Sequence, residues 1–201
     1  MRVPGKNLVY FAFPKSGSEL MRMHLNLNFG LHWNNAFDPK KWDACSILYC
    51  HARPSRTVFA ALPSDSDVQQ MFTVVRNTYA RLVSAYNYIL IENKPNFDEF
   101  IQLIADAVRD NRFESIPLCW MFMPFDLYFA GVIDQLHVLQ LDNFDELDAF
   151  LSTYDIAPIQ RKVVNGTLHD DYRTYYTNPL TVSAVQHVYA YEIERFGYKL
   201  E

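Results

Sequence analysis

The sequence has few cysteines, and this scarcity excludes one class of protein. Three cysteines among 201 residues (Cys45, Cys50 and Cys119) are too few and too scattered for a disulfide framework, so free intracellular thiols are the simpler interpretation. The spacing Cys45-x4-Cys50-His51 lacks a second pair of ligands. We therefore expect no metal site.

Long apolar runs are also missing. The longest apolar stretch, residues 115–125, is interrupted by prolines and followed by Asp126, whereas a membrane span needs about 20 apolar residues. The apolar run from Leu8 to Phe13 is not followed by the small-residue cleavage site of a signal peptide. These absences predict a cytoplasmic protein without a membrane anchor.

An excess of positive charge is absent as well. The 18 basic and 23 acidic residues give a net charge of −5, which argues against general binding of nucleic acid but still permits a local basic pocket. Hydrophobic residues make up 50% of the chain and aromatic residues 15%, a composition that excludes disorder. We expect a single domain, residues 1–201, with a buried core.

Apolar patterning predicts alternating strands and helices. Strands are expected at 8–13, at 71–75 and, as one strand or a pair, at 132–139. Helices are expected at 19–25, 79–91, 96–109, 144–151 and 178–197, with Asn96 and Asn178 as N-caps and Gly197 as the stop. This alternation favours an α/β fold with a central parallel sheet flanked by helices.

The segment Pro14-Lys15-Ser16-Gly17-Ser18 joins the first strand to the first helix. A glycine-containing turn that enters a helix N-terminus presents backbone N–H groups and a partial positive charge, which together favour an anion. Lysine adds a full charge, and the serines add hydroxyl donors. The turn lacks the Gly-Lys-Ser/Thr of a nucleoside-triphosphate loop, and an ordinary polar turn is the alternative interpretation.

A second anion-binding pair is predicted at Arg76 and Ser84, where the 71–75 strand ends and the next helix begins. Ligands of open parallel sheets bind beyond the carboxyl ends of the strands, so both segments should open onto one edge. Two separate phosphate sites fit a nucleotide that carries 5′ and 3′ phosphates.

Three segments in this order resemble the sulfotransferases. Residues 11–18 are similar to the 5′-phosphosulfate loop of that family, and residues 75–86, with Arg81-Leu82-Val83-Ser84, are similar to its 3′-phosphate motif. The tail from Val164 to Tyr198 is similar to the carbohydrate-type branch. The resemblance implies a P-loop NTPase-like sulfotransferase fold, a cytosolic form, and the co-substrate 3′-phosphoadenosine 5′-phosphosulfate (PAPS), used without metal.

The resemblance also implies roles for individual residues. Lys15 would face the leaving phosphosulfate oxygen, with Ser16, Gly17 and Ser18 around the 5′ phosphate. Arg76 and Ser84 would hold the 3′ phosphate, and Arg161 and Lys162 would reach that phosphate or the adenine.

The general base is assigned to His51, because Tyr49 to Pro54 lies between the two phosphate motifs and resembles the His-containing segment of the carbohydrate branch. An imidazole with a pKa near neutral can accept a proton. His24 is the reserve candidate. Arg53 and Arg56 could bind an anionic group of the acceptor, and ordinary surface arginines are the alternative.

Glu19 departs from the family pattern, which often has a small hydroxyl residue there, and we expect its carboxylate to point away from the phosphate. The aromatic residues Trp120, Phe122, Phe125, Tyr128 and Phe129 are expected in the core rather than in a sugar platform.

The function expected is transfer of a sulfuryl group to a hydroxyl of a saccharide or glycosylated small molecule, without nucleic-acid or membrane partners. Two alternatives stay open: a protein that binds adenosine 3′,5′-bisphosphate without catalysis, and a P-loop small-molecule kinase. The acceptor and the oligomeric state cannot be inferred from the sequence.

Overall fold

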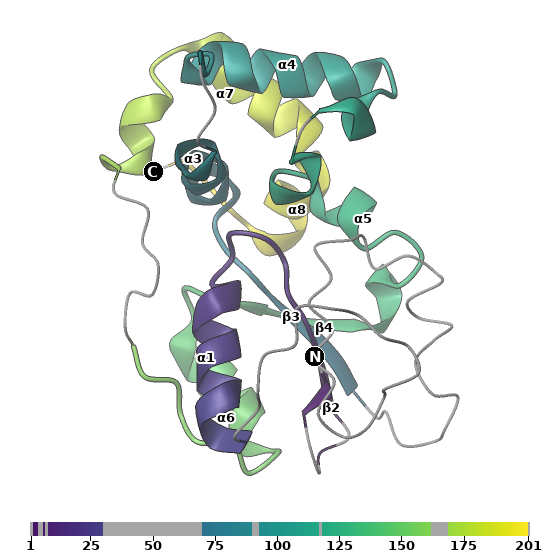
Figure 1. Ribbon diagram of the computed structural model, residues 1–201, viewed down its shortest axis with the longest axis vertical. Coiled ribbons are helices and arrows are strands. Elements are labelled where there is room, and N and C mark those ends of the chain that lie inside the picture. The colour runs from purple at the N-terminus through teal and green to yellow at the C-terminus, as the bar shows by residue number, and fades with distance from the viewer. Residues whose placement is uncertain are drawn as a thin grey trace. The chain divides into compact units, whose positions relative to one another are not determined.

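The computed structural model describes residues 2–3, 6, 8–29, 70–89, 93–116, 118–161 and 169–200. They form two compact units (Figure 1): unit 1 comprises Met1–Arg76 and Phe129–Asn165, and unit 2 comprises Asn77–Tyr128 and Gly166–Glu201. Helices and strands are mixed, as the alternating pattern predicts. That the whole chain forms one domain stays a prediction.

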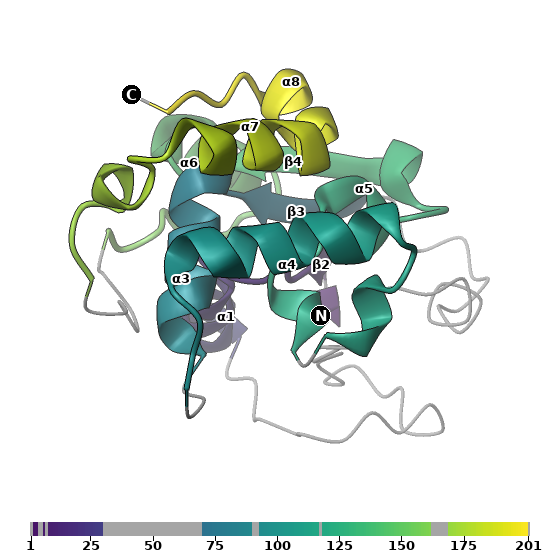
Figure 2. The same cartoon turned by 90° about the horizontal axis from the view of Figure 1, so that it is seen from above.

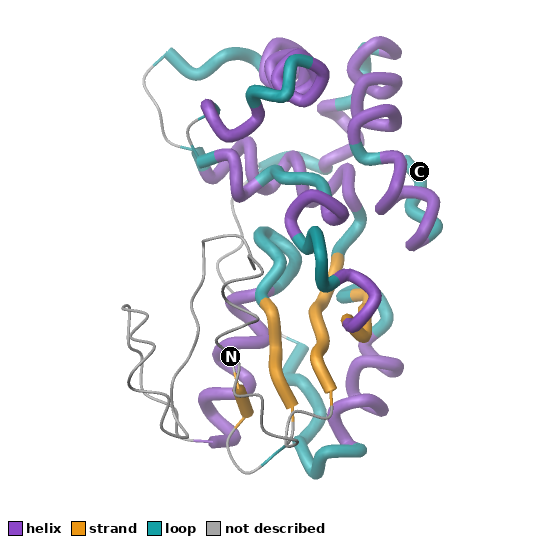
Figure 3. Tube along the Cα trace, turned by 90° about the vertical axis from the view of Figure 1, so that its right-hand side faces the viewer, coloured by secondary structure: helices purple, strands orange, loops and turns teal. Residues whose placement is uncertain are grey.

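Unit 1 contains a small sheet with three parallel strands (Figure 3). Its strands are β1 (Arg2–Val3), β2 (Leu8–Phe11), β3 (Gln70–Val75) and β4 (Leu136–Gln140), in that spatial order. β3 pairs in parallel with β2 and β4, and β1 runs antiparallel to β2. The expected parallel sheet is therefore confirmed for the described strands.

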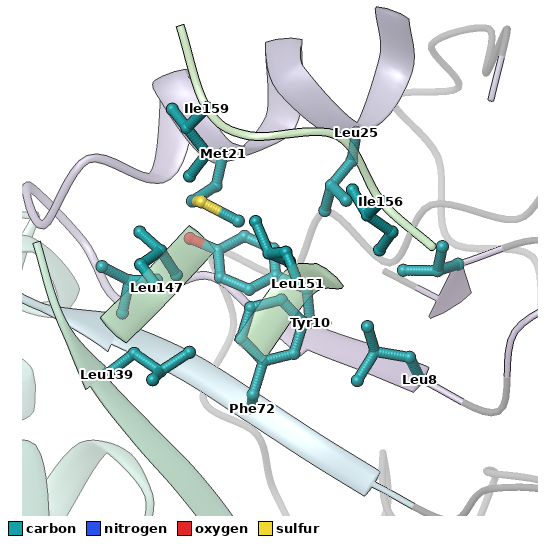
Figure 4. Packing of buried hydrophobic residues seen from close by; sticks show 12 residues of the cluster. Leu8, Tyr10, Met21, Leu25, Phe72, Leu139, Leu147, Leu151, Ile156 and Ile159 are labelled. Carbon is teal, nitrogen blue, oxygen red and sulfur yellow. The ribbon is translucent and has the colours of Figure 1, made fainter. Parts of the chain in front are cut away.

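One face of this sheet is covered by α1 (Ser18–Phe29) and α6 (Phe144–Ser152) (Figure 4). Strand side chains alternate between the two faces, so Leu8 and Tyr10 of β2 and Phe72 and Val74 of β3 point to the same face and join this core. The buried cluster includes Leu8, Tyr10, Met21, Leu25, Phe72, Val74, Leu139, Leu147 and Leu151. Burying each large apolar side chain contributes about 1.5–3 kcal/mol, which fixes α1 and α6 against the strands.

Two strand boundaries differ from the prediction. β2 ends at Phe11 rather than at residue 13, and the Thr73 hydroxyl of β3 donates to the Phe11 carbonyl at 2.7 Å. The expected strand at 132–135 is absent: Ile133–Gln135 is a short 3₁₀ helix, and the N–H groups of Val132 and Gln135 bond to the carbonyls of Phe129 and Val132. Local hydrogen bonds therefore occupy groups that a strand would have used in the sheet.

His24, the reserve general base, lies buried on α1. Its Nε2 is 2.8 Å from the carbonyl oxygen of Ala157, in the segment that follows α6. Burial lowers the pKa of His24 below its usual 6.5, although the Ala157 hydrogen bond and the charge of Asp148 act in the opposite direction. The contact with Ala157 joins α1 to the segment after α6, and the use of His24 as a base stays a prediction.

The buried imidazole predicts a pH-dependent loss of stability. The folded state resists protonation of His24, whereas the unfolded chain takes up a proton near pH 6.5. The free energy of unfolding should therefore decrease as the pH falls below about 6.5. His24→Gln should reduce this slope between about pH 5 and 6.5 in urea denaturation. A slope identical to that of the unsubstituted protein would contradict the assignment.

Unit 2 consists of α3 (Thr78–Tyr88), α4 (Phe97–Arg109), α5 (Phe125–Tyr128), α7 (Pro179–Val188) and α8 (Ala190–Phe196), with short 3₁₀ helices at 113–115, 119–121 and 172–175. α4 and α7 lie side by side (Figure 2), where the Thr181 hydroxyl and the Asn178 amide both donate to Asp98. The predicted N-caps are confirmed: Asn96 forms a capping box with Glu99, and Asn178 accepts from the Leu180 N–H.

The helix expected at 178–197 is divided at Tyr189. The ring of Tyr189 is buried, its hydroxyl donates to the Phe122 carbonyl at 2.6 Å, and the Arg81 guanidinium lies 5.5 Å from the ring centre. Gly197, with φ of 69°, ends α8 as predicted. The sequence predicts one continuous helix, and this prediction was wrong at Tyr189. There the buried contacts accompany backbone angles that are not helical.

Arg81 is fully buried in unit 2. It donates to Glu192 Oε1 at 2.8 Å and lies within 3.4 Å of the carbonyl oxygens of Met121 and Met123. The second oxygen of Glu192 accepts the Phe125 N–H at 3.1 Å. This buried ion pair links the residues around 121–125 to α3 and α8.

Candidate functional site

The candidate site lies in unit 1, beyond the carboxyl ends of two neighbouring strands. The parallel β2–β3 ladder pairs Phe11 with Thr73, so the chain leaves both strands at the same edge of the sheet. Lys15 follows β2 and Arg76 follows β3. This edge is where an open parallel sheet binds ligands, as the sequence predicts.

The segment from Phe13 to Gly17 forms a tight turn into α1. The Ser16 N–H bonds to the Phe13 carbonyl, and the Met21 N–H bonds to the Gly17 carbonyl at 3.0 Å. Lys15 and Gly17 have φ angles of 60° and 74°. Glycine adopts such angles without cost, but lysine does so rarely. A non-glycine residue held in the left-handed region is a feature that clusters at functional sites.

Lys15 and Arg76 interact electrostatically. Burial of the amine is the larger cause that lowers the pKa of Lys15 from 10.5 to about 8, and the positive charge of Arg76 is the second. The two cations therefore act on each other in one partly buried region. An anion bound there would favour the charged amine and would raise this pKa again.

Ser16 lies in the same turn and is fully buried. Its hydroxyl oxygen has no hydrogen-bond partner among the residues that the structure describes. Leaving a buried hydroxyl unsatisfied costs about 1–3 kcal/mol, so such a group is a candidate ligand contact. The turn therefore places a buried hydroxyl next to Lys15, whose amine is affected by the charge of Arg76, and this combination favours an anion.

Two further predicted residues lie in the first turn of α1. Ser18 begins the helix and Glu19 follows it. The Glu19 carboxylate accepts a hydrogen bond from Nε of Arg22 at 2.9 Å. Because Arg22 supplies an opposite charge, it reduces the repulsion that Glu19 would exert on a nearby anion.

Ser84 and Arg161 are the remaining site predictions within the described ranges. Ser84 is buried on α3 of unit 2, and its role in phosphate binding stays a prediction. Arg161 is exposed in unit 1, pairs with Asp145 at 2.9 Å and lies over the Phe144 ring. Its predicted contact with the nucleotide is therefore untested, and the nucleotide would have to compete with Asp145 for the Arg161 guanidinium.

Several predicted site residues lie outside the described ranges. These are the proposed base His51, the acceptor-binding candidates Arg53 and Arg56, and the nucleotide-binding candidate Lys162. Cys45 and Cys50 also lie there. All of these assignments stay predictions.

The aromatic residues expected in the core are largely found there. Phe122, Phe125, Tyr128 and Phe129 are buried, while Trp120 is half-buried.

Sequence reasoning did not find the buried pair of Arg81 and Glu192, because no local pattern connects residues 111 positions apart.

Comparison with known proteins gives no family assignment. A scan against protein-family models, a search of curated proteins and a search of solved structures each found no match. Within the described part of the chain, no helix has the length and apolar character needed to cross a membrane.

The interaction between the two cations can be tested directly. Arg76→Met should raise the pKa of Lys15 above 8 but leave it below 10.5, because burial is the larger cause of the shift. The pH dependence of Lys15 acetylation, followed by mass spectrometry, measures this pKa. Arg161→Met, which removes an exposed arginine of the same unit, is the control and should leave the pKa unchanged. A Lys15 pKa near 10.5 in the unsubstituted protein would refute the interaction between Lys15 and Arg76.

Proposed function

We propose that this protein is a PAPS-dependent sulfotransferase that acts on a hydroxyl of a saccharide or glycosylated small molecule. The observation that carries the proposal is the mutual influence of Lys15 and Arg76 at the ends of neighbouring parallel strands, beside the buried hydroxyl of Ser16. Two cations that disfavour each other become a stable arrangement when they bind anionic groups, which here would be the two phosphates of one nucleotide. The order of the motifs in the sequence supports a P-loop sulfotransferase fold.

The roles proposed for the site residues follow from their charges and hydroxyl groups. Lys15 would stabilise the leaving phosphosulfate oxygen, Ser16, Gly17 and Ser18 would contact the 5′ phosphate, and Arg76 would bind the 3′ phosphate. The donor supplies an activated sulfuryl group, and adenosine 3′,5′-bisphosphate is the product that leaves. His51 would take the proton of the acceptor hydroxyl as the new sulfur–oxygen bond forms.

Catalysis in this proposal depends on positioning and charge stabilisation. The protein would hold Lys15 where negative charge increases during transfer, while Arg76 would position the nucleotide, so little reorganisation is needed at the moment of reaction. A metal is not part of the proposal. Arg53 and Arg56 are the proposed contacts for an anionic acceptor, and the cytoplasm is the proposed location.

The experiment that tests this function combines binding with turnover. Purified protein is titrated with adenosine 3′,5′-bisphosphate and is then incubated with ³⁵S-labelled PAPS and a panel of saccharide acceptors. Binding together with labelled product supports the proposal, and His51→Ala should abolish product formation without weakening nucleotide binding. Transfer at an unchanged rate in His51→Ala would reject His51 as the base.

The alternatives give different results in the same assays. A nucleotide-binding protein would bind the bisphosphate and transfer nothing across the panel. A small-molecule kinase would consume ATP with Mg²⁺ and would show no preference for the 3′ phosphate. Absence of any binding to the bisphosphate would overturn the proposal.

A further inference from the structure

Leu141 connects the two charged segments of the candidate site. It directly follows β4, and its N–H donates to the carbonyl of Val75 at 2.7 Å. Val75 is the last residue of β3 and directly precedes Arg76. This hydrogen bond extends the β3–β4 ladder beyond β4, and it fixes the backbone of Val75, immediately before Arg76.

The side chain of Leu141 lies against the turn that carries Lys15. A Cβ atom placed on Gly17 would come within 2.8 Å and 2.9 Å of the two methyl carbons of Leu141. Real Cβ atoms essentially never approach other heavy atoms so closely, so the glycine is what allows this contact. Leu141 also packs against the buried core of unit 1, which restricts how far its side chain can move.

We infer that Leu141 is a positioning residue that sets the spacing between Lys15 and Arg76. Its backbone is fixed to the strand before Arg76, and its methyl groups support the turn that contains Lys15, Ser16 and Gly17. The inference rests on the proposed function, because the spacing matters for a ligand with an anionic group at this edge. Leu141 itself would not touch the reacting atoms.

Shortening the side chain should loosen the turn without removing a charge. In Leu141→Ala, water reaches Lys15 more easily, so its pKa should rise from about 8 toward 10.5. The affinity for adenosine 3′,5′-bisphosphate should fall about fivefold, a typical size for coupling through packed neighbours. Leu141→Met, which keeps the volume, should restore both values and guards against a folding defect in the alanine variant.

A double-mutant cycle tests the contact itself. Gly17→Ala should lower the midpoint of urea denaturation more than Gly197→Ala does, because both glycines have positive φ but only Gly17 has a neighbour within 4 Å of an added Cβ. Leu141→Ala should partly rescue Gly17→Ala, since it removes the atoms that the new methyl group would meet. Gly197→Ala is the matched control for backbone strain alone.

The outcomes separate this inference from the proposed function. An unchanged Lys15 pKa in Leu141→Ala, or additive effects of Gly17→Ala and Leu141→Ala, would overturn the positioning role even if the unsubstituted protein binds the nucleotide. Non-additive effects with a shifted pKa support the role. If the unsubstituted protein then failed to bind the bisphosphate, the proposed function would be refuted. The coupling between Leu141 and the turn that contains Gly17 would still be supported.

Discussion

Arg76→Met and Lys15→Met are each expected to weaken binding of adenosine 3′,5′-bisphosphate by about ten- to a hundredfold, as measured by isothermal titration calorimetry. A charge-assisted hydrogen bond contributes about 1.5–3 kcal/mol, and each substitution removes a cation while keeping an unbranched side chain. Transfer of labelled sulfate should fall further in Lys15→Met, by about 10²–10³ in rate, because charge stabilisation increases in the transition state.

Lys6→Met is the control for this experiment. Lys6 belongs to the same unit and carries the same charge, but it pairs with Asp155 at 2.9 Å. Its removal should change nucleotide affinity by less than about twofold, because its partner Asp155 is exposed to solvent, which screens the effect of this ion pair on other charges. Equal losses in Lys6→Met and Lys15→Met would mean that only net charge matters, which would contradict a specific site.

The second large effect concerns stability. Arg81→Met is expected to lower the free energy of unfolding by about 3–5 kcal/mol in urea denaturation, because it leaves the Glu192 carboxylate buried without its cation. Carbonyl oxygens of Met121 and Met123 would lose their donor as well. A variant that is too unstable to purify would agree with this expectation.

Two controls make the Arg81 prediction specific. Arg109→Met removes an exposed arginine that pairs with Asp106 and Asp110, and it should lower the free energy of unfolding far less than Arg81→Met does. Adding Glu192→Gln to Arg81→Met should recover part of the loss, since no uncompensated charge then stays buried. Equal costs for Arg81→Met and Arg109→Met would contradict the structural role of the buried pair.

Local signals explain why much of unit 1 could be predicted. The apolar run that begins at Leu8 is buried on both faces, and Pro14 with Gly17 marks the turn that follows it. The same holds for the caps at Asn96 and Asn178, where short side chains meet the first N–H groups of a helix. In these cases the residues that determine the structure are neighbours in the chain.

Long-range contacts account for what could not be predicted. Arg81 lies within the segment similar to the 3′-phosphate motif, yet its partner Glu192 is 111 positions away and gives no local signal. Likewise, the contact between Gly17 and Leu141 depends on the pairing of β3 with β4. The non-helical backbone at Tyr189 accompanies contacts with residues from other parts of unit 2, so helical periodicity alone could not reveal it.

The clearest test of a nucleotide site at Lys15 is the pKa of its amine, measured by NMR with and without adenosine 3′,5′-bisphosphate. We expect a pKa of about 8 in the free protein and a clear increase when the nucleotide binds, so that affinity falls as the pH rises through 8. Adenosine 5′-monophosphate should cause a smaller increase. A Lys15 pKa that stays the same when the bisphosphate is bound would mean that Lys15 does not contact the nucleotide.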